Sequence, residues 1–303
     1  MKKLWVMMII ALFAVLAACG GGNDEVKEEE QVENTEEQTA SEELEKLVVG
    51  VIPSLNQGNM QTAMDKLSKH FESELDIPVE ITVYPDYQAV VQAMNYDEVN
   101  MAYFGPSTYI DANEQSGARA IMTQLIDGEP FYYSYIITHK DSPLTSIEDL
   151  VAQSKDLTFA FGDPSSTSGS LIPSIELKKQ GVFTNQNEHQ FDNLLYTGGH
   201  DATALAVENK QVDAGAIDSA IFDTLQANGK IGDNFKIIWQ SEKLFQYPWA
   251  VSKVVSDELV AKIQDAFLNV KDQEILDAFA ATGFTVATDA DYEAIREAKK
   301  EAK

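Results

Sequence analysis

Short apolar runs alternate along most of this chain with stretches of helical period, and that alternation limits the fold more than any other feature. Residues 47–52 form an apolar run that stops at Pro53, as expected of a buried strand. Beyond it, Met60, Met64 and Phe71 mark one face of a helix. Further strands are expected at 79–84, 99–104, 118–126, 132–138, 157–161, 191–196, 212–217, 235–239 and 247–252. Further helices are expected at 87–95, 106–115, 146 onward, 170–180, 201–209, 219–228, 257–269, 273–281 and 291–300. Repeated strand–helix units predict an α/β fold with mostly parallel sheets flanked by helices.

The order of these units predicts two lobes, because a helical C-terminal stretch returns after the second set. We expect residues 47–137 and 245–303 to form lobe 1 and residues 138–244 to form lobe 2. The chain then crosses between the lobes twice, which makes a hinge and a ligand cleft between two halves that can close. A single parallel-sheet domain with C-terminal helices is the alternative.

The N-terminus has the pattern of an export signal. Lys2 and Lys3 precede an apolar run at 4–16, which is shorter than the roughly 20 residues of a membrane-spanning helix. Small residues then precede Cys19, the only cysteine in the chain. We interpret residues 1–19 as a lipoprotein signal peptide with the lipid on Cys19, which predicts an anchor on the outer face of the cell membrane and no disulfide. An ordinary signal peptide is the alternative.

Acidic residues dominate the charge, with a formal net charge of −27. Residues 20–46 carry eleven acidic and two basic side chains, which predicts a disordered, extended tether. The remaining residues, 47–303, still carry a net charge of −20. This balance argues against nucleic acid as a partner and against adhesion to an anionic membrane through surface charge.

Small hydroxyl residues and glycine gather where predicted strands meet predicted helices, at 163–170, 197–201, 104–108 and 54–59. Ligands of open α/β sheets bind at such junctions. Four hydroxyls and one glycine fill residues 166–170, more than one helix cap needs. Because a helix start offers free N–H groups and partial positive charge, this segment predicts an anion cradle without lysine or arginine. Ordinary helix capping is the alternative.

His200 and the rarity of arginine narrow the ligand. His200 follows two glycines at another helix start, where it can donate to an oxyanion or serve as a supporting residue. The chain has two arginines, Arg119 and Arg296, and neither lies at a predicted strand carboxyl end. Receptors that grip a carboxylate usually use a bidentate arginine, so a tetrahedral oxyanion held by neutral donors fits better.

Motifs of catalysis and of metal binding are not found in this sequence. It contains neither the Gly-x-Ser-x-Gly elbow nor a Walker-type phosphate loop. The four histidines, at 70, 139, 189 and 200, have no close metal-ligand spacing. We therefore expect no enzyme activity, no cofactor and no metal. A secreted phosphoester hydrolase and the sensing subunit of a signalling system are the alternatives from other classes.

Four motifs together resemble one known family. They are Tyr-Phe-Gly-Pro at 103–106, Asp-Pro-x-Ser-Thr-Ser-Gly at 163–169, Gly-Gly-His-Asp at 198–201 and Val-Asp-x-Gly-Ala at 212–216. In this order they are similar to the phosphate, phosphite and phosphonate-binding component of ABC importers, the PhnD-like family. The resemblance covers nearly all of residues 47–285. It implies a two-lobed periplasmic-binding-protein fold of type II, a monomer, and an importer permease and ATPase complex as partner.

The resemblance also implies a site. Ser166, Thr167 and Ser168, with the helix start at Gly169, hold the phosphorus oxygens, and His200 lies opposite. Tyr103 and Tyr87 complete the site from lobe 1. Further pocket residues are expected at Asp218, Tyr247, Trp249 and Ser107.

One departure from the family bears on the ligand. Carboxylates that hold a ligand amine in some members correspond to Ala220 and Tyr247, which carry no charge, although Asp218 lies two residues away from Ala220. The aromatic run at 131–133, together with Tyr247 and Trp249, narrows an apolar pocket or packs in the core. We therefore expect a compact ligand such as phosphite, methylphosphonate or another alkylphosphonate. A receptor for phosphate or a sulfonate is the alternative.

Overall fold

The computed structural model describes residues 44–55 and 57–302, and it describes the side chains of this part except those of 57–59. The signal peptide expected at 1–19, Cys19 and residues 20–43 of the expected tether lie outside the described residues. Within the described part, no helix combines the length and the apolar character needed to cross a membrane.

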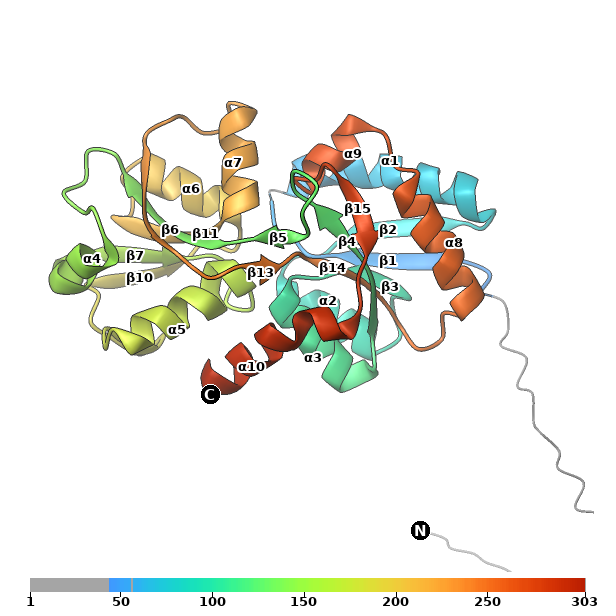
Figure 1. The fold of residues 1–303 in the computed structure, drawn as a ribbon, viewed down its shortest axis with the longest axis horizontal. Coiled ribbons are helices and arrows are strands. Elements are labelled where there is room, and N and C mark those ends of the chain that lie inside the picture. Colours follow the sequence, from blue (N-terminus) through green and yellow to red (C-terminus); the bar gives the residue numbers. More distant parts are fainter. Residues whose placement is uncertain (1–43, 56, 303) are drawn as a thin grey trace, which may run out of the picture. The chain divides into compact units, whose positions relative to one another are not determined.

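Lobe 1 is built on a six-stranded sheet (Figure 1). Its strands, in spatial order, are β15 (Gly283–Val286), β4 (Arg119–Leu125), β14 (Pro248–Val251), β3 (Met101–Tyr103), β1 (Leu47–Val51) and β2 (Val79–Val83). Its helices are α1 (Gln57–Leu75), α2 (Tyr87–Asn95), α3 (Pro106–Ser116), α8 (Asp257–Leu268) and α9 (Gln273–Ala278). The expected face of α1 is confirmed, since Met60, Met64, Leu67 and Phe71 are all fully buried.

Lobe 2 is built on a five-stranded sheet. Its strands, in spatial order, are β10 (Asn193–Tyr196), β7 (Thr158–Phe161), β11 (Ala214–Asp218), β6 (Ser134–His139) and β12 (Phe235–Gln240). Its helices are α4 (Ile147–Gln153), η1 (Ser154–Asp156), the π-helical turn η2 (Thr167–Leu171), α5 (Ile172–Lys179), α6 (His200–Glu208) and α7 (Ser219–Ala227). A small hairpin of β8 (Phe183–Asn185) and β9 (Glu188–His189) follows α5.

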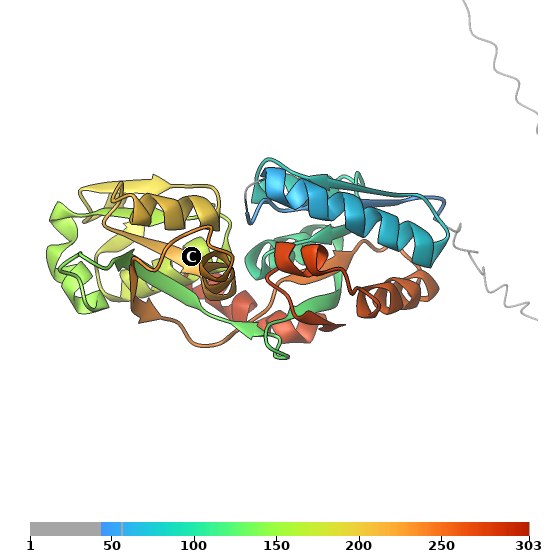
Figure 2. The same cartoon turned by 90° about the horizontal axis from the view of Figure 1, so that it is seen from above.

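Two antiparallel segments connect the lobes, and Figure 2 shows both. They are β5 (Phe131–Tyr132) and β13 (Leu244–Phe245), which pair with each other. The single strand expected at 132–138 is interrupted at Tyr133, because the backbone of Tyr133 bonds to Ser219 before β6 joins the second sheet. The residue ranges expected for the lobes stay a prediction, and β6 spans the expected boundary at 137.

The α/β fold is confirmed, but both sheets are mixed and not mostly parallel as expected, because the strands that follow the crossings between the lobes are inserted antiparallel to their neighbours. In lobe 1, β1, β2, β3 and β4 run one way while β14 and β15 run the other. In lobe 2, only β6 opposes the other four strands. Strands β6 and β14 each come directly after a crossing between the lobes. Each therefore begins at the edge of its sheet where the neighbouring parallel strands end. The carboxyl ends of the parallel strands of both lobes therefore lie near the crossings.

The C-terminal helix contacts both lobes. After η3 (Asp289–Tyr292), helix α10 (Glu293–Ala302) passes from lobe 1 toward α5 (Figure 1). Lys299 bonds to Asp111 in α3 at 2.9 Å, and Glu301 pairs with Lys179 in α5 at 3.3 Å. Strands β8, β9, β13 and β15 were not expected from the sequence, since they are short and lack alternation.

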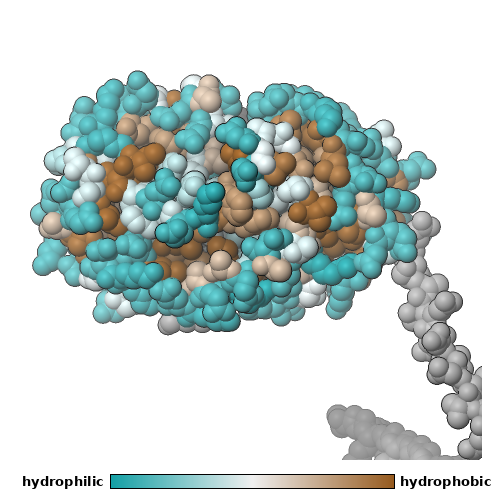
Figure 3. All heavy atoms as spheres, viewed as in Figure 1, coloured by the Kyte–Doolittle hydropathy of each residue, from teal (hydrophilic) through white to brown (hydrophobic). Residues whose placement is uncertain are grey.

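The surface of the protein is largely hydrophilic on the face shown in Figure 3. Hydrophobic residues occupy separate small areas of this face. The largest aromatic side chains instead fill the core of lobe 1, where Trp249 is fully buried.

Candidate functional site

The hydroxyl-rich segment expected to bind an anion forms the start of η2, just beyond the carboxyl end of β7. Ser166 is the N-cap, and its Oγ accepts the N–H of Gly169 at 3.1 Å. The loop is closed behind this cap by the N–H of Gly162, which donates to the carbonyl of Gly169 at 2.8 Å. Ser166, Thr167 and Ser168 are no more than 1 % exposed. A helix start leaves its first N–H groups without helical partners, so this buried turn can donate to an anion.

Thr167 connects the two lobes. Its Oγ1 accepts the backbone N–H of Ser107 at 2.7 Å, in the first turn of α3. The N-cap of α3 is Gly105, which has no side chain for this task, so Thr167 caps the helix from the opposite lobe. Because the hydroxyl acts here as an acceptor, its own proton remains available to a ligand.

His200 lies opposite this turn as a neutral hydrogen-bond donor. Its Nδ1 accepts the backbone N–H of Asp218 at 3.3 Å, which leaves the ring proton on Nε2. Nε2 lies 3.1 Å from the hydroxyl of Tyr247. Burial lowers the pKa of His200 to about 3, so the ring is uncharged at neutral pH.

Three buried tyrosines, Tyr87 of α2, Tyr132 of β5 and Tyr247 just before β14, gather around the turn and His200. The hydroxyl of Tyr87 lies beside Ser166 and Tyr247. That of Tyr132 lies beside Ser168 and Thr167. Burial raises the pKa of each of these phenols, so they stay protonated and can donate.

Tyr103 supports this arrangement from behind. Its ring stacks on that of Tyr247 at 5.6 Å, and its hydroxyl accepts the side-chain amide of Gln124 at 2.8 Å. Trp249 packs against Tyr103 and Phe267 in the core of lobe 1. The structure thus brings Tyr87 and Tyr247 to the turn and places Trp249 one layer further away.

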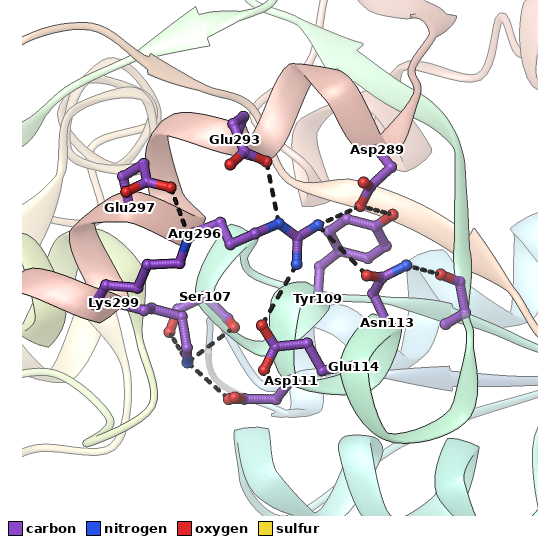
Figure 4. A network of polar contacts seen from close by, with 12 residues as sticks. Ser107, Tyr109, Asp111, Asn113, Glu114, Asp289, Glu293, Arg296, Glu297 and Lys299 are labelled. Atoms are coloured by element: carbon purple, nitrogen blue, oxygen red, sulfur yellow. Dashed lines mark hydrogen bonds and ion pairs between the residues drawn. The ribbon is translucent and has the colours of Figure 1, made fainter. Parts of the chain in front are cut away.

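The cationic side chains named in the sequence analysis are engaged elsewhere. Arg119 bonds to Asp257 at 2.9 Å, and Arg296 bonds to Asp289 at 2.7 Å. Figure 4 shows Arg296 and Lys299 extending from α10 to acidic and polar residues of α3. Lys299 bonds to the carbonyl and Oγ of Ser107, so this side chain faces α10 while its backbone N–H faces Thr167. Across the described residues, no group of histidine, cysteine and acidic side chains forms a metal cluster.

Several polar atoms at the site lack a partner within the described chain. They are Ser168 Oγ, Tyr132 Oη, Asp218 Oδ2 and Gln124 Oε1. A buried polar atom without a partner costs free energy, so such a group indicates a place where a ligand or water completes the bonding. Tyr103, Gln124, Asp218 and Tyr247 line a cavity of about 10 Å³ here. A larger pocket of about 520 Å³ lies away from the turn, between α5, β8 and the end of α10.

Sequence reasoning identified Tyr132 only as one of several aromatic residues that narrow an apolar pocket or pack in the core, so its place beside Ser168 was missed. Its position at the start of the first crossing was the available signal. Ser134 was also missed, and its Oγ fixes the turn by donating to the carbonyl of Ser168 at 2.6 Å.

Comparison with known sequences places most of the chain in one family. Residues 49–292 match the family described as "ABC transporter, phosphonate, periplasmic substrate-binding protein". The Phosphonates-binding periplasmic protein of Escherichia coli is 31 % identical over 85 % of this chain and 77 % of that protein. The Phosphate-import protein PhnD of Mycolicibacterium smegmatis is 29 % identical over 87 % of this chain and 88 % of that protein.

Solved structures with the same fold come from this group. The binding protein component of an ABC phosphonate transporter from Pseudomonas aeruginosa has a TM-score of 0.74 and 27 % identity, over 85 % of this chain and 86 % of that one. PhnD1 from Prochlorococcus marinus, in complex with methylphosphonate, has a TM-score of 0.74 and 25 % identity, over 85 % of this chain and 98 % of that one.

Proposed function

Because this chain belongs to the family of periplasmic substrate-binding proteins of ABC phosphonate transporters, we propose that it captures a small phosphorus oxyanion outside the cytoplasm and delivers it to an importer permease and ATPase complex. The observation that carries the proposal is the buried start of η2, where Ser166, Thr167 and Ser168 meet His200 and Tyr87 from the opposite side. All these groups are neutral donors. They suit an anion that is held by hydrogen bonds and not by a cation.

The proposed ligand is compact, such as methylphosphonate or phosphite. One feature supports this: the two residues that correspond to the amine-binding carboxylates of some family members are Ala220 and Tyr247, and these uncharged side chains line the small cavity next to Asp218. A hydrogen bond to a charged group contributes about 1.5–3 kcal/mol. Five or six of them, less the cost of ordering and desolvation, are consistent with micromolar binding, about −8 kcal/mol.

We propose binding without turnover. Ser166 Oγ accepts the N–H of Gly169, and the bonds of the described residues give it no adjacent general base. His200 Nδ1 is engaged as an acceptor with the backbone of Asp218, and Nε2 carries the proton. Neither ring nitrogen is free to take a proton from Ser166, as a nucleophile would require.

Titration calorimetry with methylphosphonate, phosphite, phosphate and methanesulfonate tests the proposal. We expect micromolar binding of one of the phosphorus oxyanions, and a loss of about 10- to 100-fold in Ser168→Ala. The melting temperature of this variant should not fall, because Ser168 Oγ has no partner within the described chain. Ser174→Ala is the control, since its Oγ bonds only to Leu171 in the same region. The absence of binding to every anion would refute the proposal, and a preference for methanesulfonate would identify a sulfonate receptor.

We propose further that the protein is a monomer held at the membrane by lipid on Cys19, a residue outside the described part. The signal-like segment before this cysteine supports the anchor. In cells, the wild-type protein should sediment with membranes, and Cys19→Ser should appear in the soluble fraction. Sedimentation of both proteins with membranes would contradict the lipid anchor.

A further inference from the structure

Asp218 is a buried carboxyl at a site proposed to bind an anion. It ends β11 and caps α7, where its Oδ1 accepts the N–H of Ile221 at 3.0 Å. Its side chain is 1 % exposed, and Oδ2 has no partner within the described chain. One oxygen therefore has a structural role, and the other is unpaired.

Within the described part of the chain, none of the groups that face Asp218 is a cation. They are Tyr87 of α2, Tyr103 of β3, Tyr132 of β5, Tyr135 of β6, His200 of α6, Asp223 of α7 and Tyr247 before β14. The phenols and the imidazole are neutral, and Asp223 repels a second negative charge. Burial raises the pKa of Asp218 to about 7.

A bare carboxylate beside a bound oxyanion is repulsive, whereas a proton between the two oxygens makes a short hydrogen bond. Two further unpaired atoms of the site can bond to the same ligand. Ser168 Oγ and Tyr132 Oη can each donate to a ligand oxygen, and Asp218 Oδ2 can accept from one. Two donors and one acceptor match a singly protonated phosphonate, which has two bare oxygens and one P–OH.

We propose, on the basis of the proposed function, that Asp218 shares one proton with the bound ligand and thereby selects oxyanions that can carry a proton. The proton comes with the ligand as P–OH, or from solvent when both groups are ionised. Phosphonates and phosphite satisfy this requirement. A sulfonate has the same shape but brings no proton, so at pH 8 it meets a bare carboxylate.

The experiment measures Kd for methylphosphonate and methanesulfonate between pH 6.5 and 9.5 by calorimetry. Above about pH 8 the wild-type complex must take up one proton, so Kd for methylphosphonate should rise about tenfold per pH unit. In Asp218→Asn the rise should disappear, and the preference for methylphosphonate over methanesulfonate should narrow by about tenfold or more. Asparagine still caps α7. Asp213→Asn is the control, because among the described residues its carboxylate accepts the N–H of Thr158 at the far end of β11, and this substitution should change neither result.

A second measurement uses the wild-type protein alone, so the test does not depend on folding of the variant. Calorimetry at pH 8.5 in buffers of different ionisation enthalpy should show uptake of about one proton per methylphosphonate bound. Binding without proton uptake, or an equal pH slope in Asp218→Asn, overturns the role of Asp218 and leaves the proposed function intact. Failure of wild-type protein to bind methylphosphonate or phosphite at any pH overturns both.

Discussion

Replacement of Gly169 by alanine should weaken methylphosphonate binding by more than 100-fold. A Cβ at this position would lie 2.9 Å from Ser166 Oγ and 3.1 Å from His200 Cε1. It would also lie 3.3 Å from the Cα of Gly162, which is backbone and cannot move alone. Both the cap of η2 and the imidazole must therefore shift, and a displacement of even half an ångström misaligns several donors at once.

Calorimetry and thermal unfolding of Gly169→Ala check this result. The overpacking should also destabilise the protein by about 1–3 kcal/mol. Gly283→Ala is a matched control, because its nearest non-neighbouring atom is Leu125 Cδ1 at 3.9 Å, and we expect unchanged affinity. Binding by Gly169→Ala within threefold of the wild type would mean that the ligand does not lie against this turn.

Replacement of His200 by alanine should reduce affinity by about 100-fold and destabilise the protein by about 2–4 kcal/mol. The ring is 1 % exposed, so its loss leaves a void and leaves the N–H of Asp218 without its acceptor. The donor that faces Tyr247 is lost as well. Glutamine can supply one acceptor and one donor, so His200→Gln should recover part of both losses.

The pH dependence of unfolding tests whether His200 contributes to stability through its neutral imidazole and not only by filling space. Its folded-state pKa of about 3 lies below the unfolded value, so the neutral ring contributes stability above about pH 6.5 that is lost as the pH falls toward 3. The stability difference between wild type and His200→Gln should therefore shrink over this range. His139→Ala serves as control for binding, since its Nδ1 contacts the backbone N–H and the carboxylate of Asp141 at the end of β6 away from the turn. Wild-type affinity in His200→Ala would exclude a role in binding.

Much of the fold could be predicted because its signals are local. The period of α1, the apolar run of β1 and the cap at Ser146 each depend on residues within a few positions of one another. The same is true of the turn at 166–169, where hydroxyls and glycine precede a helix and follow a strand. The order of the strand–helix units predicted two lobes, and the resemblance added the type II fold, which the structural relatives confirm.

The parts that were not predicted depend on residues far apart in the chain. Tyr132 and Ser168 are neighbours only because the first crossing passes along the turn. Thr167 caps α3 although sixty positions separate it from Ser107. The sequence placed Arg296 away from the strand carboxyl ends but could not show its partners, which are Asp289 and Glu293 of its own C-terminal segment.

By itself, the amino-acid sequence determined most of the segments that become strands and helices, and it put neutral donors at the start of a helix near residue 166. Tertiary structure alone decided which of those donors point at one another, which carboxyl is left with an unpaired oxygen, and which cations are already neutralised. The reason is physical. Helix and strand formation depends on the order of neighbouring side chains, whereas burial, pKa and hydrogen-bond satisfaction depend on what the rest of the folded chain brings within a few ångströms.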